Sequence, residues 1–329
     1  MNQHLFDVGE VTAMIRRGSS LLLAGDEKAL RQLPPGKWVG GTIPYFMGDQ
    51  GGLVDRQRVY VNELPAGLEC LAIRRYDENT IEKLYSELPP NGFGVLVAPA
   101  SSRVHLAFAA KAPTSPRFAS RPLIGWIAGV HLSETATAVP RVFDGTKAEA
   151  LDQQAVVMQI SLPKGKGVSL GILNIFTEGD GPTITFPTTG FSATEVEIDG
   201  QKRNLAEYIR QVGLDTRLPI VADYCGLSIN VSFQSVGEKE VKFYAPVFAE
   251  VAYHHARPVG NYVEEFLSQI PQGIDDKVAF SCNCILNYLY SGLEGKKTGR
   301  ITGPFVFGEV AYQLLNQTMA YLTIENVRA

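Results

Sequence analysis

The residues best suited to chemistry lie close together near the C-terminal end of the chain. Cys282 and Cys284 form a Cys-x-Cys pair after a short apolar segment. If the backbone is extended there, both thiols point to the same side, because side chains alternate along a strand. With Cys225, His254 and His255 they could form a metal site. Zinc cysteines are usually separated by at least two residues, and adjacent histidines on a strand face opposite sides. We therefore expect no metal ion.

A second interpretation makes Cys282 the nucleophile of a cysteine-dependent enzyme, with His254 or His255 as its base. This chemistry needs a thiol with a lowered pKa and a hydrogen-bonded base. No feature of the sequence brings either histidine to the thiol. A free cysteine is also a common small core residue. Catalysis by Cys282 therefore stays an alternative, and we expect a binding protein rather than an enzyme.

Glu309 follows Gly308 within an apolar stretch. A carboxylate there is costly to bury unless it is paired. It could bind an amine or guanidinium group of a ligand, or it could form a salt bridge with Arg300.

A second set of candidate residues lies near the N-terminus. Gly40 and Gly41, with Thr42 and Tyr45, could line a ligand cleft through exposed backbone amides. The competing explanation is a β-bulge. Neither a Walker motif nor a G-x-G-x-x-G pattern is present, so we expect no nucleotide or other cofactor.

Composition limits the class of protein. The 329 residues carry a net charge of −4, and the lysines and arginines are scattered, which argues against nucleic-acid binding. No apolar run approaches the roughly 18 to 20 residues of a membrane span. The N-terminal residues show no secretory signal, and the chain has only four cysteines, which suggests a reducing compartment. We expect a cytoplasmic protein without membrane contact.

Short apolar strands alternate with amphipathic helices along the chain. Residues 21–24, 38–43, 93–98 and 123–130 predict buried strands, residues 79–88 predict a helix, and residues 155–176 predict a β-hairpin. This mixture argues against an all-parallel sheet. We predict an α/β (α+β) fold, with mixed, largely antiparallel sheets packed together and helices outside.

The sequence also contains a weak internal repeat. Residues 81–89 and 263–271 match in their apolar positions, and each segment precedes a buried strand, at 94–98 and 277–281. This repeat predicts two pseudo-equivalent halves. The expected boundaries are 1–150 for the first half, 151–200 for a connecting β-hairpin region and 201–329 for the second half.

The C-terminal stretch resembles a known family. Ser281-Cys282-Asn283, then Gly303-Pro304-Phe305-x-x-Gly308-Glu309-Val310, then Asn316-Gln317-Thr318 is similar to the C-terminal part of FIST domains. The N-terminal half is similar to the FIST N-terminal part more loosely. The resemblance implies a stand-alone sensory protein that binds a small polar ligand, such as an amino acid, and signals to a separate partner. The implied ligand-binding residues are Cys282, Asn283, Gly308, Glu309 and Asn316.

A third interpretation is a structural or interaction module. In this case the exposed strands of residues 155–186 would form the contact of a homodimer.

Overall fold

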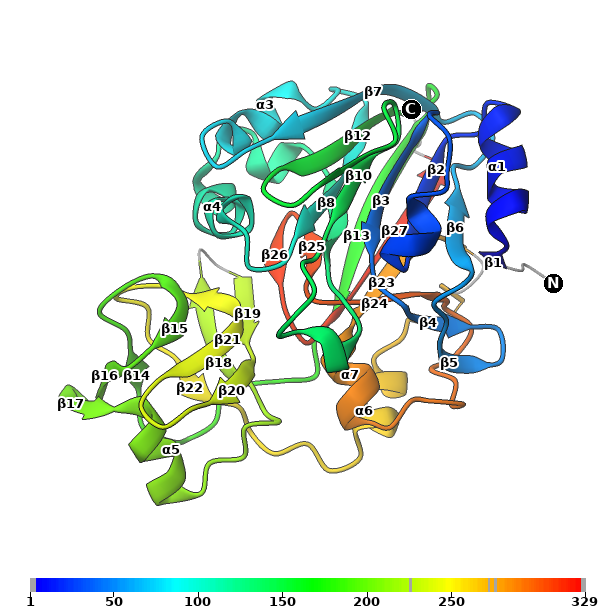
Figure 1. Ribbon diagram of the computed structural model, residues 1–329. Coiled ribbons are helices and arrows are strands. Elements are labelled where there is room, and N and C mark those ends of the chain that lie inside the picture. Colours follow the sequence, from blue (N-terminus) through cyan, green and yellow to red (C-terminus); the bar gives the residue numbers. More distant parts are fainter. Residues whose placement is uncertain (1–3, 225–226, 272, 275–276, 327–329) are drawn as a thin grey trace.

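The computed structural model describes residues 4–224, 227–271, 273–274 and 277–326. Within these ranges the body of the protein consists of three six-stranded sheets, whose strands stand side by side in Figure 1. Their orders are β1-β6-β2-β3-β10-β11, β7-β12-β8-β9-β25-β26 and β13-β27-β23-β24-β4-β5.

The bounds of the strands show that each sheet combines two parts of the chain. The first sheet contains β1 (Leu5–Phe6), β2 (Leu21–Gly25), β3 (Trp38–Thr42), β6 (Val59–Glu63), β10 (Val142–Asp144) and β11 (Glu149–Leu151). The second contains β7 (Glu69–Tyr76), β8 (Gly92–Pro99), β9 (Leu123–Ala128), β12 (Ala155–Ser161), β25 (Glu309–Ala311) and β26 (Gln313–Leu315). The third contains β4 (Tyr45–Gly48), β5 (Gly51–Val54), β13 (Lys166–Leu173), β23 (Val278–Cys284), β24 (Gly303–Val306) and β27 (Met319–Asn326).

The same succession of elements occurs three times. An outer strand leads to a helix, then to a pair of parallel strands with a second helix between them, then to a hairpin and a return strand. The parallel pairs are β2 with β3, β8 with β9 and β23 with β24. Parallel strands need such a crossover connection, because a tight turn cannot join them. The helices are α1 (Val8–Arg16) and α2 (Glu27–Leu30), α3 (Leu84–Glu87) and α4 (Arg103–Lys111), and α6 (Tyr262–Ser268) and α7 (Ile285–Tyr290).

The hairpin of each unit joins the sheet of another unit. Strand β4 of the first unit pairs with β24 of the third, β10 of the second pairs with β3 of the first, and β25 of the third pairs with β9 of the second. All three pairings are antiparallel. The exchange links the three units into a closed ring.

The predicted α/β class with mixed, largely antiparallel sheets is confirmed. The internal repeat between residues 81–98 and 263–281 corresponds to equivalent parts of the second and third units. A further copy, β2-α2-β3, lies in the first unit, so the repeat is threefold rather than twofold. Residue 150 lies within β11, and the third unit starts at β13, so the expected boundaries at 150 and 200 do not coincide with those of the units.

Residues 174–260 are inserted into the third unit between β13 and α6. In Figure 1 this inserted region, coloured green to yellow, lies beside the sheets. It forms three small sheets and one amphipathic helix within the described residues. They comprise β14 (Ile184–Thr185), β15 (Gly190–Ala193), β16 (Glu195–Ile198), β17 (Gln201–Asn204), α5 (Leu205–Val212), β18 (Ile220–Tyr224), β19 (Leu227–Val231), β20 (Phe233–Val236), β21 (Val241–Val247) and β22 (His254–His255).

The inner faces of the three sheets meet in one apolar core. Val39 from the first sheet, Val97 and Trp126 from the second, and Val306 and Ala320 from the third belong to this cluster and are fully or almost fully buried. Burial of such side chains is the main stabilising contribution. Among the described residues, no helix combines the length and apolar character needed to cross a bilayer.

Candidate functional site

Glu309 is completely buried, with 0% of its surface exposed. Its Oε2 accepts hydrogen bonds from the backbone N–H and the hydroxyl of Thr318, at 3.0 and 2.6 Å. Its Oε1 has no hydrogen-bond partner among the described residues. Burial raises the pKa of Glu309 to about 8, so the carboxyl group is largely protonated at neutral pH. Arg300, the partner considered from the sequence, is exposed.

The two thiols near Glu309 are also buried. The thiol of Cys282 donates to the carbonyl of Gly125 at 3.3 Å, and Asn316 Nδ2 donates to Cys284 Sγ at 3.8 Å. Burial, and next the neighbouring Glu309, raise the pKa of both thiols well above the usual value. A raised thiol pKa is the opposite of what a nucleophilic cysteine needs. Asn316 therefore contacts Cys284 and not Cys282, the thiol favoured from the sequence.

The histidines lie elsewhere. His254 and His255 form β22 in the inserted region, and His255 Nε2 bonds to the carbonyl of Asp215 at 2.9 Å. Cys225 lies outside the described residues. In the parts of the chain that the structure describes, no group of three His, Cys, Asp or Glu residues is arranged to hold a metal ion.

The remaining C-terminal candidates make contacts within the chain. Asn283 Oδ1 accepts from Asn287 at 2.8 Å, and Asn316 Oδ1 accepts from the backbone N–H of Ser232 at 3.1 Å. A side chain on Gly308 would lie 3.1 Å from Ile127. The structure therefore brings these residues into one polar cluster, but the cluster is buried and largely satisfied by its own hydrogen bonds.

Gly40 and Gly41 lie inside β3, between β2 and β10, with a regular register on both sides. A Cβ on Gly41 would lie 2.7 Å from Val97 Cγ1 and 2.8 Å from Trp126 Nε1. These glycines therefore allow the first and second sheets to pack closely, and their strand is paired on both edges. The residues that follow these glycines, Thr42, Ile43 and Pro44, line a cavity.

A cavity of about 460 Å³ opens at the carboxyl ends of β2 and β3 in the first sheet and of β9 in the second. Asp26 directly follows β2, Thr42 ends β3, and Gly129 directly follows β9. Ligands of α/β proteins commonly bind at this end of the strands, because the loops there converge. We call this space the charged cavity. Its charged lining residues are Asp26, Glu27, Lys28, Arg31, Arg56 and Glu134.

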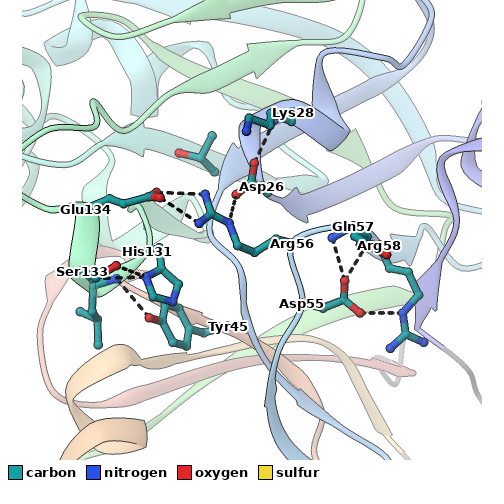
Figure 2. A network of polar contacts seen from close by, with 12 residues as sticks. Asp26, Lys28, Tyr45, Asp55, Arg56, Gln57, Arg58, His131, Ser133 and Glu134 are labelled. Atoms are coloured by element: carbon teal, nitrogen blue, oxygen red, sulfur yellow. Dashed lines mark hydrogen bonds and ion pairs between the residues drawn. The ribbon is translucent and has the colours of Figure 1, made fainter.

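Arg56 is the centre of the polar network in this cavity (Figure 2). Its Nε donates to Asp26 at 2.8 Å, and its two terminal nitrogens donate to the carboxylate of Glu134 at 2.8 and 3.0 Å. Asp26 is nearly buried and also accepts from the backbone N–H of Lys28, which caps α2. Bidentate pairing fixes the guanidinium plane as well as its position.

Residues 129–141, the connection from β9 to β10, supply six of the residues that line the cavity, and we call this connection the strap. Thr42 holds both ends of the strap: its hydroxyl donates to the carbonyl of Gly129 at 2.7 Å and accepts from the N–H of Arg141 at 2.9 Å. Tyr45 holds the first part of the strap, because its ring stacks on His131 and its hydroxyl accepts from the N–H of Leu132. The corresponding connections in the other units, residues 43–44 and 307–308, are much shorter.

Thr42 and Tyr45 are predicted from the sequence, but the charged residues of the cavity are not. Asp26 directly follows a buried strand, and this position was the one available signal. Arg56 lies in a loop and Glu134 ends a short 3-10 helix (Leu132–Glu134), and their contact joins distant parts of the chain.

The chain belongs to a family of unknown function, DUF6976, which matches residues 6–325. No curated protein and no solved structure matches it. The resemblance to FIST domains was therefore wrong, because the family match covers nearly the whole chain and is to DUF6976. The short motifs that suggested FIST domains belong to the buried polar cluster around Glu309, where packing explains them.

Proposed function

We propose that the protein binds a small zwitterionic molecule, such as an amino acid, in the charged cavity. The lining supports this because it carries three acidic and three basic side chains. Carboxylates can accept hydrogen bonds from an ammonium group, and guanidinium groups can donate to a carboxylate. A lining with balanced charge suits a ligand that carries both charges better than a polyanion such as a nucleotide.

The network at Arg56 is the observation that carries the proposal. Arg56 and Glu134 are partly exposed, at 42% and 35%, and such ion pairs contribute only about 0 to 1 kcal/mol. A ligand carboxylate can therefore compete with Glu134 for the guanidinium at little cost. The volume of about 460 Å³ also falls within the range of small-molecule sites.

A sensory role requires that binding change a surface that another protein contacts. The strap is suited to this role, because it lines the cavity and carries Glu134, one of the two carboxylates bound to Arg56. The proposed partner is a separate signalling protein.

Calorimetric titration with the twenty standard amino acids at pH 7 tests the binding proposal. The variant is Arg56→Gln, and the matched control is Arg58→Gln. Arg58 has the same exposure, 41%, and also forms an ion pair, with Asp55, but it lies outside the cavity lining and is directed away from it (Figure 2). We expect at least one amino acid to bind to the wild type and to Arg58→Gln, and to bind about tenfold more weakly to Arg56→Gln.

Two results would contradict the proposal. If the wild type binds none of the amino acids, the ligand class is wrong. If a ligand binds equally well to both variants, the site lies elsewhere.

A further inference from the structure

A second cavity, of about 270 Å³, adjoins the charged cavity. Val130, Ala138 and Val139 of the strap line both spaces. Val139 is half exposed, at 50%, whereas Val130 is buried and belongs to an apolar core cluster. The lining of the second cavity includes a single charged side chain, Asp152, and this carboxylate is paired with Arg141 at 3.0 Å. We call this space the neutral cavity.

Six neutral polar side chains line the neutral cavity. Ser102 and Thr135 donate to backbone carbonyls, at 2.7 and 3.2 Å. The other four are Ser101, Gln153, Gln234 and Tyr244. Within the described part of the chain, none of these four side chains forms a hydrogen bond. Burial raises the pKa of Tyr244 to about 12, so its hydroxyl remains protonated and can donate. The set therefore offers hydroxyl and amide groups that can both donate and accept.

These groups come from separate parts of the fold. Ser101 lies in the turn between β8 and α4, and Gln153 lies between β11 and β12. Gln234 lies on β20 and Tyr244 on β21, and both strands belong to the inserted region. The neutral cavity thus lies between the inserted region and the ring of sheets, and ligand sites occur preferentially at such boundaries.

Ser101 has a conformation that is unusual for a residue with a side chain. Its φ is 57°, and its N–H donates to Nδ1 of the buried His105 at 3.1 Å. Non-glycine residues in this left-handed region are strained, and such strain is often found at ligand sites. The turn that holds Ser101 joins β8 to α4 in the second unit, as the turn at Asp26 joins β2 to α2 in the first. The two cavities therefore use equivalent positions of consecutive units.

We propose that the neutral cavity is a subsite for an uncharged hydrogen-bonding arm of the same ligand. This inference rests on the proposed function and specifies its substrate class: a zwitterion that carries an amide or hydroxyl group on its side chain. The zwitterionic head lies in the charged cavity, and the arm passes under the strap toward Gln153, Gln234 and Tyr244. An anionic arm is disfavoured because the charged residue in this lining, Asp152, is itself acidic. An apolar arm is disfavoured because it leaves the polar groups unpaired.

Three amino acids of matched shape test this proposal by calorimetric titration. L-glutamine, L-glutamate and L-homoleucine share the head group and a side chain of the same length and branching, but their arms are neutral polar, anionic and apolar. We expect wild-type protein to bind glutamine about tenfold more tightly than either of the others, which corresponds to about one good hydrogen bond.

The variant Gln234→Ala locates the arm. It should weaken glutamine binding and leave homoleucine binding unchanged. The matched control is Gln201→Ala, because Gln201 is also an exposed glutamine of the inserted region but lines neither cavity. It should leave the affinity for all three ligands unchanged, and far-ultraviolet circular dichroism should show that both variants are folded.

The outcomes separate the two proposals. Equal affinity of the wild type for glutamine and homoleucine, or equal weakening of both by Gln234→Ala, overturns the subsite but leaves zwitterion binding intact. Failure of all three ligands to bind overturns the subsite. If the wider set of amino acids also fails to bind, the proposed function is overturned as well.

Discussion

The guanidinium of Arg56 forms two nearly parallel hydrogen bonds with the carboxylate of Glu134, at 2.8 and 3.0 Å, and so ties the loop before β6 to the middle of the strap. We expect this tie to be weak, because both side chains are partly exposed. A double-mutant cycle with Arg56→Gln and Glu134→Gln, measured by urea unfolding, should give a coupling free energy of about 0.2 to 1 kcal/mol. The coupling should shrink in 1 M salt, because salt screens exposed charges.

A coupling well above this range, unchanged by salt, would mean that the strap is fixed in place. Such a result would count against ligand entry beneath it.

The buried carboxyl group of Glu309 should make stability depend on pH. Its pKa is about 8 in the folded protein and near the ordinary 4.5 in the unfolded chain. The folded state therefore binds the proton more tightly, and the resulting stabilisation is complete below pH 4.5 and is lost as the pH rises through 8. Glu309→Gln removes this titration. Between pH 5 and 8, the free energy of unfolding of the wild type should fall relative to that of the variant, by at most about 1.4 kcal/mol per pH unit.

Asp55→Asn provides a control for this measurement. Burial tends to raise the pKa of Asp55, but hydrogen bonds from Arg58 and Gln57 outweigh it, and the pKa lies below its usual 3.8. The stabilisation from Asp55 is therefore lost only as the pH falls below that range, and this control should not change the slope between pH 5 and 8. Parallel stability curves for the wild type and Glu309→Gln would contradict the buried, protonated state of Glu309.

Replacement of Gly41 should show whether this glycine sets the spacing between the first and second sheets. In Gly41→Ala the new methyl group would lie 2.7 Å from Val97 and 2.8 Å from Trp126, so the first two sheets must move apart. We expect a loss of about 1 to 3 kcal/mol in the free energy of unfolding. In the control Gly9→Ala, the methyl group would have no heavy atom within 4 Å, and helix α1 should gain up to about 1 kcal/mol. Equal stability of the two variants would show that Gly41 does not set the sheet spacing.

The cysteines should differ in reactivity in the folded protein. Burial raises the thiol pKa of Cys282, Cys284 and Cys70, but Cys282 and Cys284 are buried whereas Cys70 is partly exposed. Iodoacetamide at pH 8, followed by peptide mass mapping, should label Cys70 first and should reach Cys282 and Cys284 only after unfolding in urea. Rapid labelling of Cys282 in the native protein would instead support the cysteine-dependent enzyme.

The repeat was partly predictable from the sequence, because it leaves a local pattern. The helix at residues 81–89 and the strand at 94–98 recur at 263–281, since each copy must bury the same face against its own sheet. The pairing of the sheets was not predictable in this way. Strand β4 pairs with β24, and β10 with β3, across long stretches of chain, and short apolar strands carry little information about distant partners.

The candidate site illustrates a different limit. Polar residues in apolar surroundings, such as Glu309 and Asn316, suggested a ligand site, but they form a buried hydrogen-bonded cluster. Asp26 could have been identified from its position after β2. Arg56 and Glu134 could not, because single charged residues in loops are common and their pairing depends on the completed fold.

The exchange of hairpins among the three units has a consequence for synthesis of the protein. Strand β4, with the fully buried Phe46, is made long before its partner β24. The first sheet likewise remains incomplete until β10 of the second unit has been made. A nascent chain therefore exposes unpaired strand edges until β24 and β25 have been made, and the ring closes only after the third unit is present. Loss of β24 would thus damage a part of the molecule that is made much earlier.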